Sequence, residues 1–466
     1  MMTGVVLFLA YLAVVSLAVY AVRRAEGLAA LVAAAGSLGG AVALWKLPLA
    51  GYTRLAGRPV ALGAAFSLQD LTLAITPAAR TLLVFLLAVA AVTFILAWRT
   101  HQGRSFYPFG LALVALWATV ALIHPLTWAP LAFVLASIVA VFLIQAGRPG
   151  DTRGAWRQML FPSLAAPLFL VAAWYIEQAP LNPDNTTPYR IAGWLLIAGF
   201  VLLLQPAPLH VAMPAVARQS PPVVAAFLWI GGQSTTLFLL QRFLVTYPWL
   251  ATMVDSARWL LWFGVLTAVT GGVLAALQDR LGTFAGYAVV YDYGVLLVAM
   301  ALSGSVGLSI TIWLLLTRTV ALLTLAAGAA MLRHHLESDR FAAIKGAASR
   351  LPWATSALIM GGFAVAGLPL SAQFASRWAL LQLVAGSDTR WVVLLVLGGV
   401  GVLAGALRAG MACFGKLTGS PVEREPMMLG LLAGLLVVTG LVLALFPQVL
   451  AAPVAAVIGP LSALEP

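Results

Sequence analysis

Residues 203–242 read LLQPAPLHVAMPAVARQSPPVVAAFLWIGGQSTTLFLLQR, a proline-rich interruption followed by a long apolar run. Its five prolines cannot all lie inside one regular helix, because proline removes a backbone donor and clashes with the preceding turn. A second interruption, GGFAVAGLPLSAQFASRW at 361–378, places glycines and a proline within another apolar stretch. Irregular backbone at membrane depth needs protein or water around it. We therefore expect two broken helices, with a pair of ordinary proline kinks as the alternative.

The composition of the whole chain indicates an integral membrane protein. Of its 466 residues 62% are hydrophobic and only 9% are charged, whereas soluble domains carry about 25% charged residues. The mean hydropathy is +1.02. The single cysteine, Cys413, excludes an internal disulfide and a cysteine-rich metal site. The net charge of +12 reflects basic membrane loops rather than a nucleic-acid partner.

The apolar stretches predict an all-α polytopic fold with about fourteen transmembrane helices. A crossing needs about 20 predominantly apolar residues. The longest stretch that does not span, 47–78, contains glycine and proline and is predicted to be an extramembrane connector, with a hairpin as one form. The candidate crossings are 4–22, 28–46, 79–98, 107–124, 126–146, 158–177, 191–206, 222–246, 257–277, 283–302, 306–333, 352–372, 391–414 and 428–449.

The distribution of basic residues predicts the orientation of the chain. Fourteen crossings leave both termini on one side. Fifteen of the 26 basic residues, among them Arg148, Lys416 and Arg424, fall near helix ends on the opposite side, and nine, including Arg377, fall on the side of the termini. Because cytoplasmic loops are enriched in Lys and Arg, we predict a multi-pass protein of the inner (cytoplasmic) membrane with both termini periplasmic or extracellular. Arg318 and Arg408 lie within helices and enter neither count.

Three blocks of residues occur in the order of a known family. The first block resembles the signature of the antiporter-like membrane subunits of respiratory complex I (NADH-quinone oxidoreductase) and of multisubunit cation/proton antiporters. In that signature a Pro-aromatic/Leu-His step precedes Trp-Leu-Pro, Ala-Pro and a helix ending in arginine. The matching residues are Pro208, Leu209, His210, Pro214, Pro222 and Arg242, then Ala276, Leu277, Gln278, Tyr287 and Gly294, and finally Gly367, Leu368, Pro369, Phe374, Arg377 and Trp378.

The resemblance covers about residues 105–415 and implies an internal organisation. It implies two inverted five-helix repeats, each with one broken helix, near 205–245 and 365–385. We accordingly divide the chain into N-terminal transmembrane helices with the connector, a first and a second antiporter-like repeat, and a C-terminal helix with its tail. The predicted boundaries of these four parts are 1–106, 107–246, 247–415 and 416–466.

Members of this family move protons, and this chain departs from the family at the lysines that serve that purpose. The lysine before the first broken helix falls on Leu203, that of the next helix on Ser234, and that of the second broken helix on Arg377. The three lysines of the chain, Lys46, Lys345 and Lys416, are not central to any predicted crossing. Arginine, with a pKa above about 12, keeps its proton. The sequence therefore predicts a divergent member without a lysine relay.

Few ionisable residues remain at membrane depth. Asp292 and Arg318 fall near the middle of two successive crossings, and a charge there costs about 2.5–3.5 kcal/mol or more. We expect the two neighbouring helices to pair these charges. We interpret the pair as a buried structural contact that joins the two helices. The alternative is that it is the remnant of a central axis of polar groups through the membrane.

Other polar groups cluster at and after the first interruption. His210 would titrate near neutral pH if it were hydrated, but in a proline-rich break we expect it to satisfy backbone carbonyls, with a place on a proton path as the alternative. We expect Gln205, Gln233, Ser234 and their threonine neighbours to bond between helices, with ordered water as the alternative. The candidate polar axis thus comprises His210, Gln205, Ser234, Asp292, Arg318 and Arg377.

These observations lead to one preferred function and two alternatives. We predict a non-catalytic membrane-arm subunit of a complex I-like proton-translocating respiratory complex, acting as a scaffold or as an altered proton path. The alternatives are a subunit of a cation/proton antiporter or ion-coupled uptake system that uses protons or sodium, and a stand-alone solute transporter. The expected partners are other membrane subunits and the lipid bilayer. We expect no cofactor, no metal and no nucleic acid, because the chain lacks motifs for phosphate, flavin, iron–sulfur or nicotinamide groups.

Overall fold

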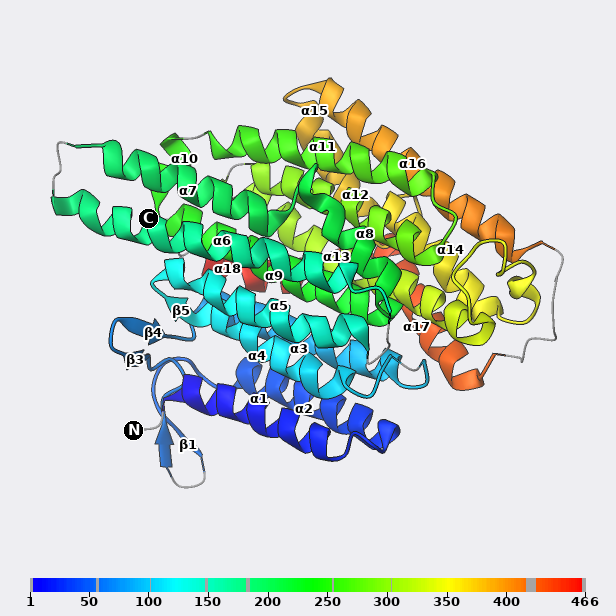
Figure 1. The fold of residues 1–466 in the computed structure, drawn as a ribbon, viewed down its shortest axis with the longest axis horizontal. Helices are drawn as coiled ribbons and strands as arrows, with labels where there is room; N and C mark the ends of the chain where they lie inside the picture. The colour runs from blue at the N-terminus through cyan, green and yellow to red at the C-terminus, as the bar shows by residue number, and fades with distance from the viewer. Residues whose placement is uncertain are drawn as a thin grey trace.

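The computed structural model describes residues 3–55, 58–100, 102–146, 150–181, 185–253, 255–302, 304–415 and 425–462. Arg148, Lys416 and Arg424, which entered the prediction of orientation, lie outside these ranges. The described chain is an elongated bundle of helices, and both termini lie at the same end of it (Figure 1). We call that end the terminal side. The predicted all-α polytopic fold is confirmed.

The N-terminal part contains four helices and the small strands of the connector. The helices are α1 (Gly4–Ala21), α2 (Glu26–Lys46), α3 (Pro77–Ala97) and α4 (Phe106–Leu122). The strands β1 (Thr53–Leu55) and β2 (Arg58–Val60) form one antiparallel hairpin, and β3 (Phe66–Leu68) and β4 (Leu71–Leu73) form another, which β5 (Ile123–His124) extends. The predicted connector therefore contains hairpins at the terminal side (Figure 1).

The middle of the chain contains the first broken helix. It comprises η1 (Leu126–Trp128), α5 (Ala129–Gln145), α6 (Arg153–Gln178), η2 (Ala179–Leu181), α7 (Thr187–Leu204), η3 (Leu209–Val211), α8 (Ala212–Gln219) and α9 (Pro222–Thr246). α7 and α8 are the two halves of one interrupted crossing. The break begins at Gln205, which takes a left-handed backbone conformation with φ 50°.

The C-terminal half contains the second broken helix. It comprises α10 (Pro248–Met253), α11 (Ser256–Ala276), α12 (Leu281–Ala301), α13 (Gly304–Leu336), η4 (Ala347–Ser349), α14 (Pro352–Ala366), α15 (Phe374–Ala385), α16 (Thr389–Cys413), α17 (Met427–Leu445), η5 (Pro447–Leu450) and α18 (Ala451–Ser462). Here α14 and α15 are the two halves. Both predicted breaks are confirmed, whereas the inverted repeats and the four predicted parts of the chain stay predictions.

Twelve helical segments of the described chain are long and apolar enough to cross a membrane. Two shorter helices, α4 and α14, occupy the places of the remaining predicted crossings, and α15 continues the path of α14 after the break. The helix order therefore fits the fourteen predicted crossings.

Arg408, which we placed inside a helix, is exposed near the end of α16 and donates to the Ala276 carbonyl oxygen at 2.5 Å.

Glycines let several helices approach at backbone distance. A Cβ atom on Gly272 of α11 would lie 2.1 Å from the Gly398 carbonyl oxygen of α16. A Cβ atom on Gly361 of α14 would lie 2.4 Å from the Leu325 backbone nitrogen of α13. Small residues at such crossings are the usual basis of close helix packing in membranes. The crossings bring α11 against α16 and α13 against α14.

Two neighbouring glycines of α9 provide a test of this packing. A Cβ atom on Gly231 would lie 2.1 Å from the buried ring of Trp117, whereas one on Gly232 would meet that ring only at 3.8 Å, an ordinary contact. We expect Gly231→Ala to destabilise the protein by about 1–3 kcal/mol through overpacking. Gly232→Ala is the matched control and should be neutral or stabilising by up to about 1 kcal/mol. Thermal unfolding in detergent measures both, and equal effects would contradict the packing described here.

Candidate functional site: a buried Arg–Asp–Arg cluster

Three charged side chains meet at membrane depth between α12, α13 and α15. The Arg318 Nε atom donates to Asp292 Oδ2 at 2.7 Å, and the Arg377 Nη2 atom donates to Asp292 Oδ1 at 2.6 Å. The aspartate thus accepts one charge-assisted hydrogen bond on each carboxylate oxygen, the strong class of protein hydrogen bond. The expected pairing of Asp292 with Arg318 is present, and Arg377 completes a triad.

The triad is almost entirely removed from solvent. Arg318 is 1% exposed, Asp292 2% and Arg377 5%. Two guanidinium groups face one carboxylate, so the triad carries one positive charge in excess. Buried charges are tolerated only when they are paired and hydrogen-bonded. The arrangement therefore depends on Asp292, which is the only anion in contact with either arginine among the described residues.

Two glutamines extend the triad at its ends. The Arg318 Nη2 atom donates to Gln233 Oε1 of α9 at 2.6 Å, and the Arg377 Nε atom donates to Gln373 Oε1 at 2.7 Å. The result is a continuous row of five polar side chains across the interior of the bundle. We call these five residues, Gln233, Arg318, Asp292, Arg377 and Gln373, the polar row.

The second break places Arg377 in the row. Gly367 ends α14 with φ +82°, and the amides of Gly367 and Leu368 both donate to the Phe363 carbonyl oxygen. A Cβ atom on Gly367 would lie 2.4 Å from Arg377 Cδ, so glycine supplies both the left-handed conformation and the space. The guanidinium group of Arg377 also lies over the ring of Tyr291, 4.8 Å from its centroid. Because Arg377 is buried at the break, it does not belong among the terminal-side charges, and that assignment was wrong.

The first break leaves its polar residues apart from the triad. After Gln205 the Ala207 amide donates to the Thr267 hydroxyl oxygen of α11 at 2.9 Å, which anchors the irregular segment to a neighbouring helix. Gln205 lines a cavity of about 70 Å³ that also reaches Gln233 and Tyr293. His210 is buried, and its Nδ1 atom has no hydrogen-bond partner, so a bond from this nitrogen to a backbone carbonyl is absent.

The polar run of α9 divides between three environments. Gln233 bonds to α13, as expected for an interhelical contact. Thr235 and Thr236 instead donate to carbonyl oxygens one turn back in their own helix, at 2.8 and 2.9 Å, so the expected interhelical bonds of these two are absent. Ser234 is 2% exposed, has no hydrogen-bond partner and faces a different cavity from Gln233. Ser234 is therefore outside the polar row.

Sequence reasoning missed two members of the site. Gln373 belongs to the irregular segment after Gly367, and no periodic pattern shows which way a side chain points there. Tyr291 directly precedes Asp292, and its ring was indistinguishable from any other apolar contact of α12. A signal did exist for Gln373, since it lies four residues before Arg377, the spacing of neighbouring residues on a helix.

Comparison with known proteins agrees with this architecture. Residues 175–402, which include both breaks and the whole triad, match the family described as NADH:quinone oxidoreductase/Mrp antiporter, TM. The chain is homologous to the antiporter-like membrane subunits of this family. Subunit N of the NADH-quinone oxidoreductase of Geotalea uraniireducens is 25% identical over 392 residues, covering 79% of this chain and 78% of the relative.

Two solved structures of multisubunit membrane complexes contain chains with the same fold. A chain of the membrane-bound sulfane sulfur reductase, an archaeal respiratory membrane complex, superposes with a TM-score of 0.81 at 15% identity and covers 98% of this chain and 97% of that one. A chain of the Mrp complex from Dietzia sp. DQ12-45-1b gives a TM-score of 0.79 at 16% identity, with coverage of 100% and 98%. These similarities establish the shared fold.

Within the family fold, the two lysines among the described residues lie away from the polar row. Lys46 ends α2, and Lys345 lies in the loop between α13 and α14. The row itself contains two arginines, two glutamines and one aspartate. Glutamine does not titrate, and arginine keeps its proton. Asp292 is therefore the one carboxylate of the row, and it is hydrogen-bonded to both guanidinium groups.

Proposed function

We propose that this chain is a membrane-arm subunit of a complex I-like, proton-translocating respiratory complex. Its sequence relatives are subunits N of NADH-quinone oxidoreductases, and its fold is that of chains in multisubunit respiratory and antiporter complexes. Its partners would be the other membrane subunits of that complex. A subunit of a cation/proton antiporter is the second candidate, supported by the 0.79 TM-score with the Mrp chain.

We further propose that the polar row acts as an electrostatic scaffold rather than as a proton relay. The observation that carries this proposal is the pairing of Asp292 with two arginines at 2.6 and 2.7 Å. A relay needs groups that gain and lose protons at accessible pH. This row contains one carboxylate, and that carboxylate is hydrogen-bonded to two arginines. Its role would be to hold the broken helix α14–α15 against α12, α13 and α9.

The location and orientation of the chain are part of the same proposal. The excess of basic residues on the side opposite the termini supports a cytoplasmic location for that side and a periplasmic or extracellular one for both termini. A cytoplasmic membrane that houses a respiratory complex fits this arrangement. Protease accessibility of tags placed at each terminus, compared between intact cells and inverted vesicles, tests the orientation.

The membership proposal is tested by purifying the chain under native conditions and identifying what accompanies it. We expect other membrane subunits together with quinone-reducing components. Components of a cation/proton antiporter without any redox subunit would support the second candidate instead. A chain that purifies alone and carries a solute across reconstituted vesicles would contradict both.

Arg318→Met separates a scaffold from a relay with little disturbance. The variant keeps the Asp292–Arg377 pair and lowers the buried charge of the row to zero, while Asp292 Oδ2 and Gln233 Oε1 each lose a donor. We expect a loss of stability of about 1–3 kcal/mol from these orphaned acceptors. Proton translocation per assembled complex, measured in reconstituted vesicles, should be unchanged. Translocation abolished in fully assembled complexes would instead show that Arg318 takes part in transfer.

A further inference from the structure

A cavity of about 160 Å³ lies beside the buried triad, between α12, α16 and the break that separates α14 from α15. Tyr291 of α12 and Gly399 of α16 line it near the middle of two membrane-crossing helices, so the cavity lies at membrane depth. Arg377 forms part of the wall, and apart from Tyr291 and the glycines every other lining residue is alanine, valine or leucine. The cavity is therefore an apolar space with one cation in its wall.

Arg377 has one guanidinium nitrogen that the polar row does not use. Its Nε atom donates to Gln373 and its Nη2 atom donates to Asp292, and neither of these acceptors lines the cavity. The Nη1 atom is buried and has no hydrogen-bond partner, and the whole residue is 5% exposed. A buried donor without a partner is costly, and more so when it belongs to a charged group. Nη1 is therefore the donor that a molecule in the cavity would satisfy.

The charge of the triad favours a ligand with one negative charge. Two arginines face a single aspartate, so one positive charge is in excess, and Asp292 is the only anion that contacts either arginine in the described part of the chain. A net charge at membrane depth is costly unless it is paired. One anion at Arg377 Nη1 brings the sum to zero without displacing Asp292.

The cavity faces the outside of the bundle along α16. Val396 and Val400, which line it, are 47% and 54% exposed, and α16 lies at the outer edge of the bundle in Figure 1. Exposed valines in the middle of a crossing helix contact acyl chains in a bilayer. A ligand that carries an apolar chain therefore reaches Arg377 from the lipid phase, between α16 and the break.

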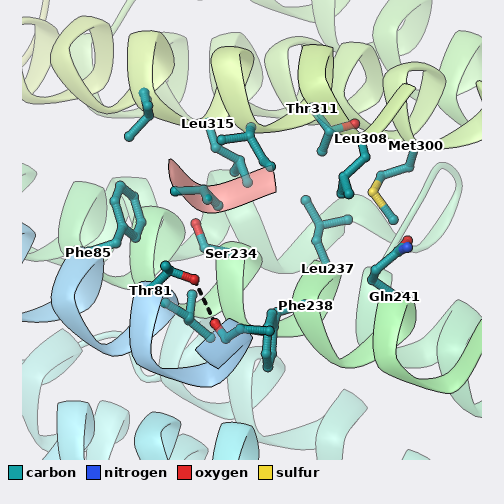
Figure 2. Close-up of a pocket in the computed structure, with 15 residues that line it drawn as sticks. Thr81, Phe85, Ser234, Leu237, Phe238, Gln241, Met300, Leu308, Thr311 and Leu315 are labelled. Atoms are coloured by element: carbon teal, nitrogen blue, oxygen red, sulfur yellow. Dashed lines mark hydrogen bonds between the residues drawn. The ribbon is translucent and has the colours of Figure 1, made fainter. Parts of the chain in front are cut away.

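The cavity shown in Figure 2 offers the same kind of space without a cation. It measures about 100 Å³, lies between α3, α9, α13 and α18, and is walled mainly by aliphatic and phenylalanine side chains. Its polar groups are hydroxyls and one amide, among them the unpaired Ser234 hydroxyl, and none of its lining residues in the described chain is charged. It therefore serves as an internal reference for apolar binding that has no preference for an anion.

We propose that the cavity beside Arg377 binds the carboxylate of a long-chain fatty acid from the bilayer. The carboxylate accepts a charge-assisted hydrogen bond from Nη1, the aliphatic wall contacts the first methylene groups, and the rest of the chain lies along the exposed face of α16. A phospholipid would have to bring a larger headgroup and two chains to this depth, so a single-chain carboxylate fits the space better. This goes beyond the scaffold role and requires neither partner subunits nor proton translocation, so failure of one proposal leaves the other standing.

Photolabelling of the chain, together with any subunits that accompany it, in nanodiscs of zwitterionic phospholipid tests the site. The probe is a long-chain fatty acid that carries a diazirine near its carboxyl end, and the alcohol of the same chain is the uncharged control. Labelled peptides are identified by mass spectrometry. Two variants change the cavity, Arg377→Met by removing the cation and Val400→Trp by filling the opening while the triad stays intact. Leu315→Trp fills the cavity of Figure 2 and is the matched control.

We expect the acid to label residues 395–403 of α16 at least about tenfold more than the alcohol, because a charge-assisted hydrogen bond distinguishes the two probes. Arg377→Met should make the two probes label equally, Val400→Trp should remove labelling of this segment by the acid, and Leu315→Trp should change neither. If Arg377→Met does not fold, Val400→Trp and the comparison of acid with alcohol on the unmodified chain decide. The proposal is overturned if acid and alcohol label the unmodified chain equally, if the acid labels other segments instead, if folded Arg377→Met keeps the preference, if Val400→Trp has no effect, or if chloride or acetate displaces the acid.

Discussion

Asp292→Asn should reduce the amount of folded, assembled protein more than any other single substitution in the polar row. The aspartate accepts from two arginines, and its neutralisation leaves two buried positive charges without an anion. An amide also presents a donor to one of the guanidinium groups. Removing one partner of a buried ion pair destabilises the folded state by about 3–5 kcal/mol. Thermal unfolding in detergent and the yield of intact complex measure the loss.

A second aspartate–arginine pair serves as the control. Asp339 accepts from Arg280 at 3.3 Å in a loop contact whose side chains are 16% and 28% exposed. Exposed or half-exposed pairs contribute about 0–1 kcal/mol, so Asp339→Asn should leave folding nearly unchanged. One outcome would contradict the scaffold proposal. If Asp292→Asn gives normal amounts of complex that no longer translocates protons, Asp292 carries protons and the scaffold proposal is wrong.

The fold was predictable because its signals are compositional and local. Long apolar runs predict membrane helices, since every backbone polar group in a bilayer must be satisfied within the segment. The prolines after Gln205 and the glycine at 367 predict breaks, because their backbone restrictions act within a turn. The hairpins of the 47–78 connector follow from the same local preferences. None of these inferences needed knowledge of which helices are neighbours.

The site was predictable only in part because it depends on which helices meet. Asp292 and Arg318 were paired in advance on the cost of an isolated charge at membrane depth. That argument could not add Arg377, because tertiary contacts with Tyr291 and Asp292 fix the direction of its side chain after the break. Ser234 and Gln233 are adjacent in sequence yet face different cavities. The rotation of α9 about its own axis determines which of the two side chains faces the polar row. The sequence does not predict this rotation, because the helix is almost uniformly apolar.

Replacing the whole polar row by apolar residues should restore the folding that Asp292→Asn removes. The variant combines Asp292→Leu, Arg318→Met, Arg377→Met, Gln233→Leu and Gln373→Leu, so no charge and no acceptor of the row is left unpaired. Exchange of a buried ion network for well-packed apolar side chains of similar volume is often neutral or stabilising by about 1–4 kcal/mol. We therefore expect assembly close to that of the unmodified chain, measured by yield of complex and by thermal unfolding.

The same variant separates mechanical support from proton transfer, because it keeps the shape of the site and removes all of its chemistry. If the row is a scaffold, the assembled complex translocates protons at the original ratio to electrons transferred, since the protons pass through other subunits. A lower ratio in a fully assembled complex would mean that this subunit contributes a path of its own. Asp292 would then be the proton carrier, because the other four side chains of the row are arginine and glutamine.

The smallest unit of such a path is found by restoring residues to the apolar variant. Restoring aspartate alone at position 292 would leave a buried carboxylate without its guanidinium partners. The ratio of protons to electrons is compared between two add-back variants, one with Asp292 alone and one with Asp292 and Arg377 together. If only the second variant recovers the ratio, the pair is the smallest unit that moves the proton.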